Sequence, residues 1–164
     1  MKNSSTRYEP RSEPPVEMKD APAGMVNYCV NGPSTKNKAQ DYGPAKMVDT
    51  LRKGLPFQEL EALRFMLSIP MDRLASLLMI SKATLHRRKA SGRLDQLESD
   101  RVVRFARLVG KAVEVIESEE GARQWLAAPQ RGLGGAIPLE FAGTEVGARE
   151  VEDLLTRIDH GVYS

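Results

Sequence analysis

Residues 71–94, MDRLASLLMISKATLHRRKASGRL, hold the most specific local pattern in the chain. Their apolar spacing predicts two short helices, residues 71–78 and 81–90, with residues 79–80 between them. Helices joined this closely cross steeply, so they touch through small or apolar side chains at fixed offsets. Ala75 is the critical contact, because a larger side chain would hold the helices apart. The stretch therefore predicts a helix-turn-helix whose other contacts are Leu74, Leu78, Ile80 and Leu85.

The second helix of this pair is strongly basic. Ser81 is placed to cap it, and its N-terminal half projects outward, where side chains could reach base edges in a DNA major groove. The basic residues Arg88, Lys89 and Arg93 would lie closer to phosphates. The alternative is an ordinary helical hairpin with a solvated basic face. The residues predicted to contact DNA are Ser81, Lys82, Ala83, Thr84, His86, Arg87, Arg88 and Lys89.

Residues 81–89, SKATLHRRK, resemble the recognition helix of the Xre or Cro class of DNA-binding domains. Met79 departs from that pattern, because it occupies a turn position where glycine is common. One such unit makes few base contacts, and phosphate neutralisation alone gives weak, salt-sensitive binding. We therefore expect a homodimer or larger assembly on a dyad-symmetric operator.

Composition limits the other function classes. The 164-residue chain is 41% hydrophobic, which is enough for a modest core, and it contains no run of about 18 apolar residues. Because residues 1–15 lack the apolar segment of a signal peptide, we expect no membrane association and a cytoplasmic location. Cys29 is the single cysteine, so with only His86 and His160 as other soft ligands we expect neither a metal site nor a cofactor.

The net charge of +2 hides two opposite halves. Residues 71–111 carry ten cations against four anions, or +6, whereas residues 112–164 carry four cations against ten anions, or −6. A basic block suits a polyanion and an acidic block does not. The two halves are therefore expected to have different partners.

The beginning of the chain lacks helical or strand periodicity. Residues 1–45 contain six prolines among polar residues, so residues 1–50 are predicted to be a flexible leader. Residues 24–30, GMVNYCV, form a short apolar patch that could add a strand or dock on a partner, and a bare linker is the favoured interpretation.

The chain from Leu55 onward is predicted to be all-α. Helix starts are expected at Pro56, at Ser99 with Asp100, at Ser118 and at Thr144. Two helices have predicted buried stripes, and Gly161 should end the last one. The expected organisation is a leader (1–50), a helix-turn-helix region (51–97) and a C-terminal region (98–164). The stripes are Val102, Phe105, Ala106, Val109, Val113 and Ile116, then Val151, Leu154, Leu155 and Ile158.

The C-terminal region has no recognisable catalytic pattern. Its carboxylates are spread as on a solvated surface, and residues 132–135, GLGG, lack the Lys-Ser/Thr of a phosphate loop. His160 has no cysteine or serine placed near it by a motif, and near a helix end it could instead be a favourable cation for the helix dipole. We expect no enzyme and no small-molecule substrate.

Three stretches of this region resemble the C-terminal toxin-binding domain of Xre/MbcA/ParS antitoxins. They are LDQLESDRVVRFARLVGKAVEVI (94–116), GARQWLAAPQRGLGGAIPLEF (121–141) and TEVGAREVEDLLTRIDHGVYS (144–164), and their motifs follow the family order. The chain departs from the family in two places. Ala136 stands where the family often has a basic residue, and the leader has no recognised counterpart. The resemblance implies a bifunctional antitoxin that represses its own operon and neutralises a RES-domain toxin, an NAD-consuming enzyme.

The resemblance also implies that the C-terminal segment blocks the toxin's NAD pocket. Tyr163 could fill an apolar slot and the Ser164 carboxylate could pair with cations that bind phosphates. The alternatives are a tail folded back on its own domain, an antitoxin for a toxin that uses NAD to modify a protein, and a dimeric transcription regulator without a toxin partner. The predicted toxin-binding residues are Arg157, His160, Gly161, Val162, Tyr163 and Ser164.

Overall fold

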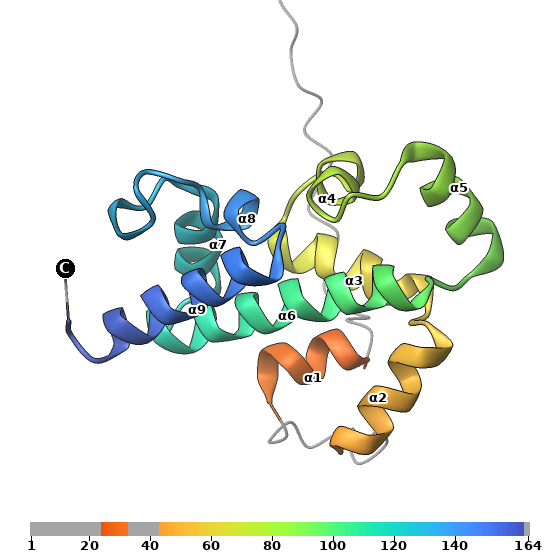
Figure 1. The fold of residues 1–164 in the computed structure, drawn as a ribbon, viewed down its shortest axis with the longest axis horizontal. Coiled ribbons are helices and arrows are strands. Elements are labelled where there is room, and N and C mark those ends of the chain that lie inside the picture. The colour runs from red at the N-terminus through yellow and green to blue at the C-terminus, as the bar shows by residue number, and fades with distance from the viewer. Residues whose placement is uncertain (1–23, 33–42, 163–164) are drawn as a thin grey trace, which may run out of the picture.

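The computed structural model describes residues 24–32 and 43–162, and in this part of the chain every regular element is a helix (Figure 1). The predicted all-α fold, with the helix-turn-helix ahead of a C-terminal helical region, is therefore confirmed. The helices are α1 (Met25–Asn31), α2 (Pro44–Lys53), α3 (Phe57–Leu67), α4 (Met71–Leu77), α5 (Lys82–Ser91), α6 (Gln96–Ile116), α7 (Glu119–Ala127), the short 3-10 helix η1 (Arg131–Leu133), α8 (Pro138–Phe141) and α9 (Glu145–Asp159).

Helix α6, with 21 residues, begins at a capping box. The Asp95 carboxylate accepts a hydrogen bond from the Glu98 N–H (2.8 Å), and the Glu98 carboxylate accepts one from the Asp95 N–H (2.9 Å). This exchange satisfies backbone donors that a helix start leaves unpaired. The predicted start at Ser99 and Asp100 is wrong. Ser99 is fully buried inside the helix, where its hydroxyl accepts a hydrogen bond from the Leu55 N–H (2.8 Å).

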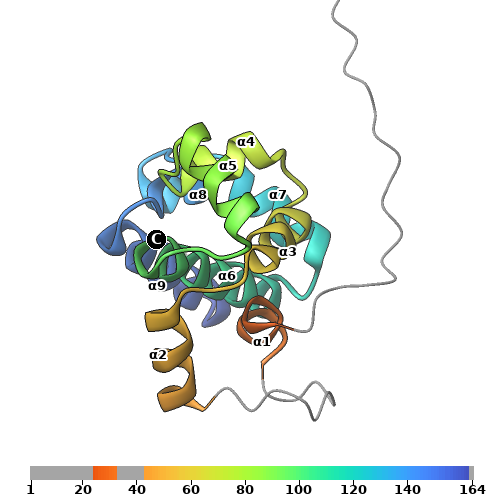
Figure 2. The same cartoon turned by 90° about the vertical axis from the view of Figure 1, so that its right-hand side faces the viewer.

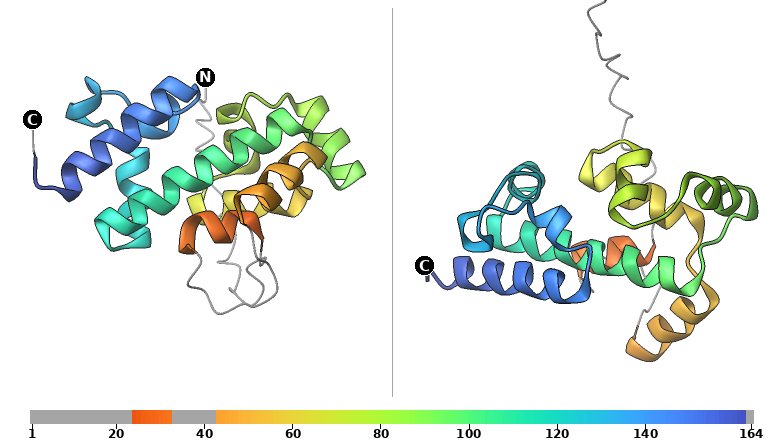
Figure 3. Two further views of the ribbon diagram at one scale, coloured as in Figure 1. Left: turned by 60° about the horizontal axis from the view of Figure 1, so that its bottom comes forward. Right: turned by 45° about the horizontal axis from the view of Figure 1, so that its top comes forward.

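The other helices are arranged around α6. Helices α4 and α5 lie on one side of it and α1 and α2 on the other (Figures 1 and 2). Helix α9 runs beside its second half (Figure 3), held by ion pairs of Arg104 with Glu145 (2.9 Å) and Arg107 with Glu152 (3.5 Å). The predicted stripes of α6 and α9 form the core between them, and the fully or nearly fully buried members are Val102, Phe105, Ala106, Val109, Val151, Leu154 and Leu155.

Part of the predicted leader belongs to this core. Residues 25–31 form helix α1, which packs on α6 and α3, and its Met25 and Val26 side chains are completely buried. Gly110 of α6 permits the contact, because a Cβ there would lie 2.3 Å from the Cys29 carbonyl oxygen. The interpretation of residues 24–30 as a bare linker is thus wrong, and α2 adds a second helix before residue 54. The remaining leader residues, 1–23 and 33–42, lie outside the described part.

Helix α1 is capped by a side chain from another helix. The buried Glu59 carboxylate of α3 accepts hydrogen bonds from the N–H groups of Met25 (2.9 Å) and Val26 (3.0 Å). Burial raises the pKa of Glu59, although these two bonds act in the opposite direction. A seven-residue helix is too short to be stable alone, so this distant cap and the contact with α6 explain why it forms.

We predict that Glu59→Ala releases α1. Hydrogen bonds to a charged group contribute more than neutral ones, so the free energy of unfolding should fall by about 2 kcal/mol. Amides of residues 28–31 should also exchange hydrogen faster than they do in the wild-type protein, whereas exchange in α6 should change less. Glu61→Ala is the matched control, since Glu61 is exposed on the same helix. Unchanged exchange in the Glu59 variant would show that the cap does not hold α1.

Candidate functional sites

The α4–α5 pair has the contacts predicted for a helix-turn-helix. Leu74, Ala75, Leu78 and Ile80 are buried, and Leu85 is half-buried. Between the helices, the Ile80 N–H donates to the Ala75 carbonyl (2.8 Å), which closes the turn.

Met79 takes the left-handed conformation in this turn, with φ of 54°, at the position where glycine is common. Arg101 of α6 donates to the Leu78 carbonyl (2.9 Å) and so fastens the turn to the central helix. The predicted motif is thus attached to the body of the protein by a polar contact as well as by its apolar core.

Helix α5 presents most of its predicted DNA-contacting side chains to solvent. Ser81 is its N-cap as predicted, and its hydroxyl accepts a hydrogen bond from the Thr84 N–H (3.1 Å). Thr84 is half-buried, and Lys82 is 3.9 Å from Asp72 in an exposed pair that contributes little. The exposed members of the predicted set are Ser81, Lys82, Ala83, His86, Arg87 and Lys89.

Arg88 is the exception to this arrangement. Its side chain is only 20% exposed, and it donates from Nε to Glu98 (2.7 Å) and from Nη2 to Asp95 (2.7 Å). The hydrogen bond to Glu98 and the two nearby carboxylates raise the pKa of Arg88 above its usual range. The expected orientation of Arg88 toward phosphates is therefore not the one in the structure. The D-x-x-E pattern at residues 95–98, shortly after Arg88, is a sequence feature that marks a capping box but does not by itself indicate the contact with Arg88.

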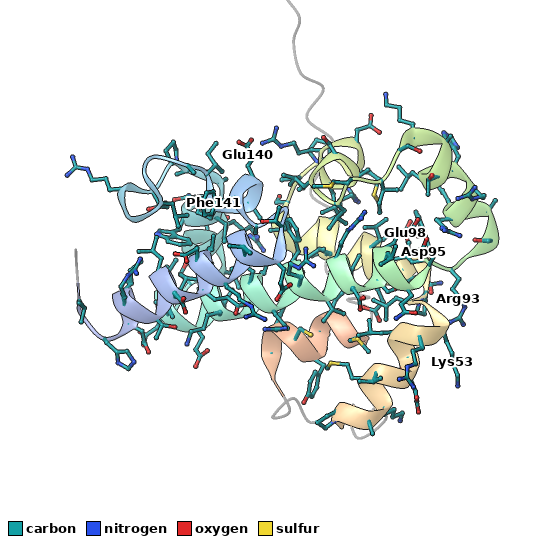
Figure 4. All side chains as sticks on the ribbon, viewed as in Figure 1. Lys53, Arg93, Asp95, Glu98, Glu140 and Phe141 are labelled. Atoms are coloured by element: carbon teal, nitrogen blue, oxygen red, sulfur yellow. The ribbon has the colours of Figure 1, made fainter. Side chains whose placement is uncertain are left out.

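Internal pairing also reduces the basic block elsewhere. Arg104 and Arg107, counted within the +6 segment, are paired with glutamates of α9. Arg73 of α4 pairs with Glu140 of α8 at 2.6 Å, and Glu140 extends from α8 in Figure 4. The positive charge that faces solvent on the helix-turn-helix is consequently concentrated on α5.

The C-terminal end of α9 turns away from its helix axis. Gly161 has φ of 68°, and the Val162 N–H donates to the Arg157 carbonyl (2.9 Å). This is the glycine-terminated helix end predicted from the sequence. Arg157 is half-buried, His160 is exposed at the C-cap, and Val162 is 53% exposed, so Val162 does not fold back onto the domain. The predicted contacts Tyr163 and Ser164 lie outside the described residues.

The two candidate surfaces lie far apart. Helix α5 is near the start of α6, whereas the C-terminal end of α9 is near the opposite end of α6 (Figure 1). The two candidate surfaces therefore share no helix other than the α6 that lies between them.

A cleft of about 770 Å³ is lined by residues of α1, α6 and α9. Its walls carry both signs of charge, including Arg107, Lys111, Glu114 and Asp153. Burial raises the pKa of the Cys29 thiol in this cleft to about 11, so the thiolate is scarce at neutral pH.

No group of three or more His, Cys, Asp or Glu side chains in the described ranges could hold a metal ion. None of the helices described is long and apolar enough to span a bilayer.

Comparison with known proteins agrees with this architecture. Residues 46–107 match the Antitoxin Xre-like helix-turn-helix domain, and residues 111–161 match the Antitoxin Xre/MbcA/ParS C-terminal toxin-binding domain. The chain is 34% identical over 141 residues to Antitoxin Xre of Yersinia enterocolitica, which covers 80% of this chain and 95% of that protein. The chain belongs to the Xre antitoxin family.

Two further family members match shorter parts. Antitoxin Xre of Photorhabdus laumondii is 39% identical over 74 residues, covering 44% of this chain and 50% of that protein. Antitoxin Xre of Pseudomonas putida is 33% identical over 64 residues, covering 39% of this chain and 40% of that protein. The two matched domains meet at residues 107–111, inside the continuous helix α6, and neither includes α1.

We predict that Ala75→Leu separates α4 from α5. The buried methyl has no room for three more carbons, so the free energy of unfolding should fall by about 2 kcal/mol and DNA binding should be lost. Ser76→Leu adds similar bulk to the exposed face of the same helix and should leave both properties near wild type. Urea unfolding and a DNA mobility assay measure the two effects, and equal behaviour of the two variants would contradict the prediction.

Proposed function

We propose that the chain is the antitoxin of a type II toxin–antitoxin system, with DNA bound by the helix-turn-helix and a toxin bound by the C-terminal domain. The observation that carries this proposal is the succession of the two matched antitoxin domains along one chain. The separation of the two surfaces along α6 supports simultaneous binding of both partners (Figure 1).

The DNA-binding half of the proposal rests on α5. Its exposed Lys82, His86 and Arg87 are available to base edges, and Lys89 to phosphates. The target is the chain's own operator, so the protein represses its operon. Since one recognition helix contacts few base pairs, two copies act together on a dyad-symmetric site, as a homodimer or a larger assembly.

The toxin-binding half rests on the C-terminal segment. The 15-residue helix α9 is a stiff support, and Gly161 directs the chain off its axis, so little conformational entropy is lost when the last residues dock. We propose that the partner is a RES-domain toxin that degrades NAD and that residues 157–164 block its active site. Tyr163 would fill a ring slot, and the terminal carboxylate of Ser164 would pair with phosphate-binding cations.

In this proposal the protein is not an enzyme. It acts in the cytoplasm and uses neither a cofactor nor a small-molecule substrate. Two other functions make different predictions. An antitoxin for a toxin that transfers ADP-ribose to a protein would use the same tail, and identification of the toxin's product distinguishes it. A dimeric regulator without a toxin partner would need no tail.

Removal of residues 161–164 tests the toxin-binding half. We expect the truncated protein to lose neutralisation of the co-expressed toxin while it retains operator binding, because α5 lies far from the tail. Tyr163→Ala tests the role of the ring, and a glycine added after Ser164 tests the position of the terminal carboxylate. Tyr163→Phe is the control, because it keeps the ring. Full protection of cells by the truncated protein would eliminate the blocking mechanism.

Substitution of Lys82 and Arg87 tests the DNA-binding half. Each change to alanine should weaken operator binding by about 1–3 kcal/mol if the side chain reads a base, and by a smaller amount with a lower salt slope if it contacts a phosphate. Toxin neutralisation should be unchanged. Arg149→Ala is the charge-matched control, because Arg149 is exposed on α9. An equal effect of Arg149→Ala would mean that net charge alone controls binding.

A further inference from the structure

Helix α5 makes little apolar contact with the rest of the protein. A recognition helix must be held at a fixed angle, yet none of the ten residues of α5 is fully buried. Leu85 is its half-buried apolar contact with the core. Apolar packing therefore restrains this helix weakly, and its orientation needs a second anchor.

Arg88 supplies a rigid polar contact at the C-terminal half of α5. Its guanidinium uses two nitrogens, Nε toward Glu98 and Nη2 toward Asp95, each at 2.7 Å. A planar fork that contacts two acceptors fixes direction as well as distance. Asp95 and Glu98 lie at the start of α6, beside α5 (Figure 4).

The two acceptors are themselves held in place. Asp95 and Glu98 form the capping box of α6, so each carboxylate already accepts a backbone N–H while it accepts Arg88. The Glu98 side chain is only 7% exposed, and the helix N-terminus favours negative charge at both positions. Arg88 thus connects α5 to acceptors that cannot follow its movement without breaking the start of α6.

We infer that Arg88 is a positioning residue that sets the angle of the recognition helix on α6, and that it is not a DNA ligand. The inference rests on the proposed DNA-binding function. A phosphate that captured Arg88 would leave two carboxylates, one of them buried, without their counter-charge, which is costly. Among the residues that the structure describes, the exposed neighbours Arg87 and Lys89 have no such ion pair, and they remain the cations that meet DNA.

Arg88→Ala, Arg88→Lys and the matched variant Lys89→Ala provide the first test. Binding is measured to a duplex from upstream of the gene that encodes this chain and to a random duplex of equal length, over a range of salt concentrations. Both Arg88 variants should lower the ratio of the affinity for the upstream duplex to that for the random duplex about tenfold, because a helix that was held in one orientation then samples several. The salt slope should be unchanged. Lys89→Ala should reduce the salt slope by about one, the mark of a lost phosphate contact.

The lysine variant makes the test specific. It keeps the charge but lacks the fork, so a phosphate ligand would be rescued by Arg88→Lys and a positioning fork would not. A reduced salt slope in Arg88→Ala, together with normal binding in Arg88→Lys, would overturn the inference.

The double variant Asp95→Asn, Glu98→Gln tests the acceptors. Asparagine and glutamine still suit a capping box, so α6 should keep its start while the ion pairs lose their charge. The affinity ratio should fall as in Arg88→Ala, and adding Arg88→Ala should lower it no further. A rise in the ratio would mean that these carboxylates compete with DNA for Arg88, and would overturn the inference.

Hydrogen exchange in the DNA-free protein gives a readout that does not depend on the proposed function. Amides of α5 should exchange at least about tenfold faster in Arg88→Ala and Arg88→Lys than in Lys89→Ala, with α6 and α9 unchanged. Equal protection of α5 in all variants would overturn the positioning role. Absence of preference for the upstream duplex in the wild-type protein would instead refute the DNA-binding proposal while the exchange result stands.

Discussion

The structure depends on the burial of α6 against several helices at once. One face packs with α9, and other parts of its surface receive α1, α3 and α7. A helix surrounded in this way needs apolar side chains over more than one stripe and close approach where a backbone crosses it. Gly110 provides that approach for α1, since any Cβ would collide with the Cys29 carbonyl. The folded core of both matched domains is therefore one core, built on a single continuous helix.

Polar contacts fix the orientation of the helices that the apolar core does not restrain strongly. Arg88 and Arg101 attach the helix-turn-helix to α6, and Glu59 attaches α1 to α3. Each contact joins a charged side chain to a group that is already fixed by a helix end or a turn. Such contacts add modest stability, but they restrict direction, which apolar burial does not. Helix α5, which has no fully buried residue, and the seven-residue helix α1 are both held by such contacts.

Charge has two uses in this chain. Arg104 and Arg107 of α6 pair with glutamates of α9, which joins the basic segment to the acidic segment in the fold. The cations of α5 other than Arg88 remain on the surface, where a polyanion can reach them. The proposed division of labour, with DNA at one end of α6 and a toxin at the other, follows from this distribution and from the exposed turn at Gly161. A count of charges along the sequence could not separate the two uses.

Elements whose causes are local could be predicted from the sequence. The α4–α5 contacts, the caps at Ser81, Ser118 and Thr144 and the end at Gly161 depend on residues within a few positions, so spacing alone predicted them. The helix at residues 25–31, the start of α6 and the direction of Arg88 depend instead on contacts between residues that are distant in sequence or that meet only in the folded chain. The cap of α1 lies 34 residues away in sequence, and Ser99 is occupied by the distant Leu55 N–H. The basic composition of α5 predicts a surface cation at Arg88, because its carboxylate partners become neighbours only when α5 packs against the start of α6.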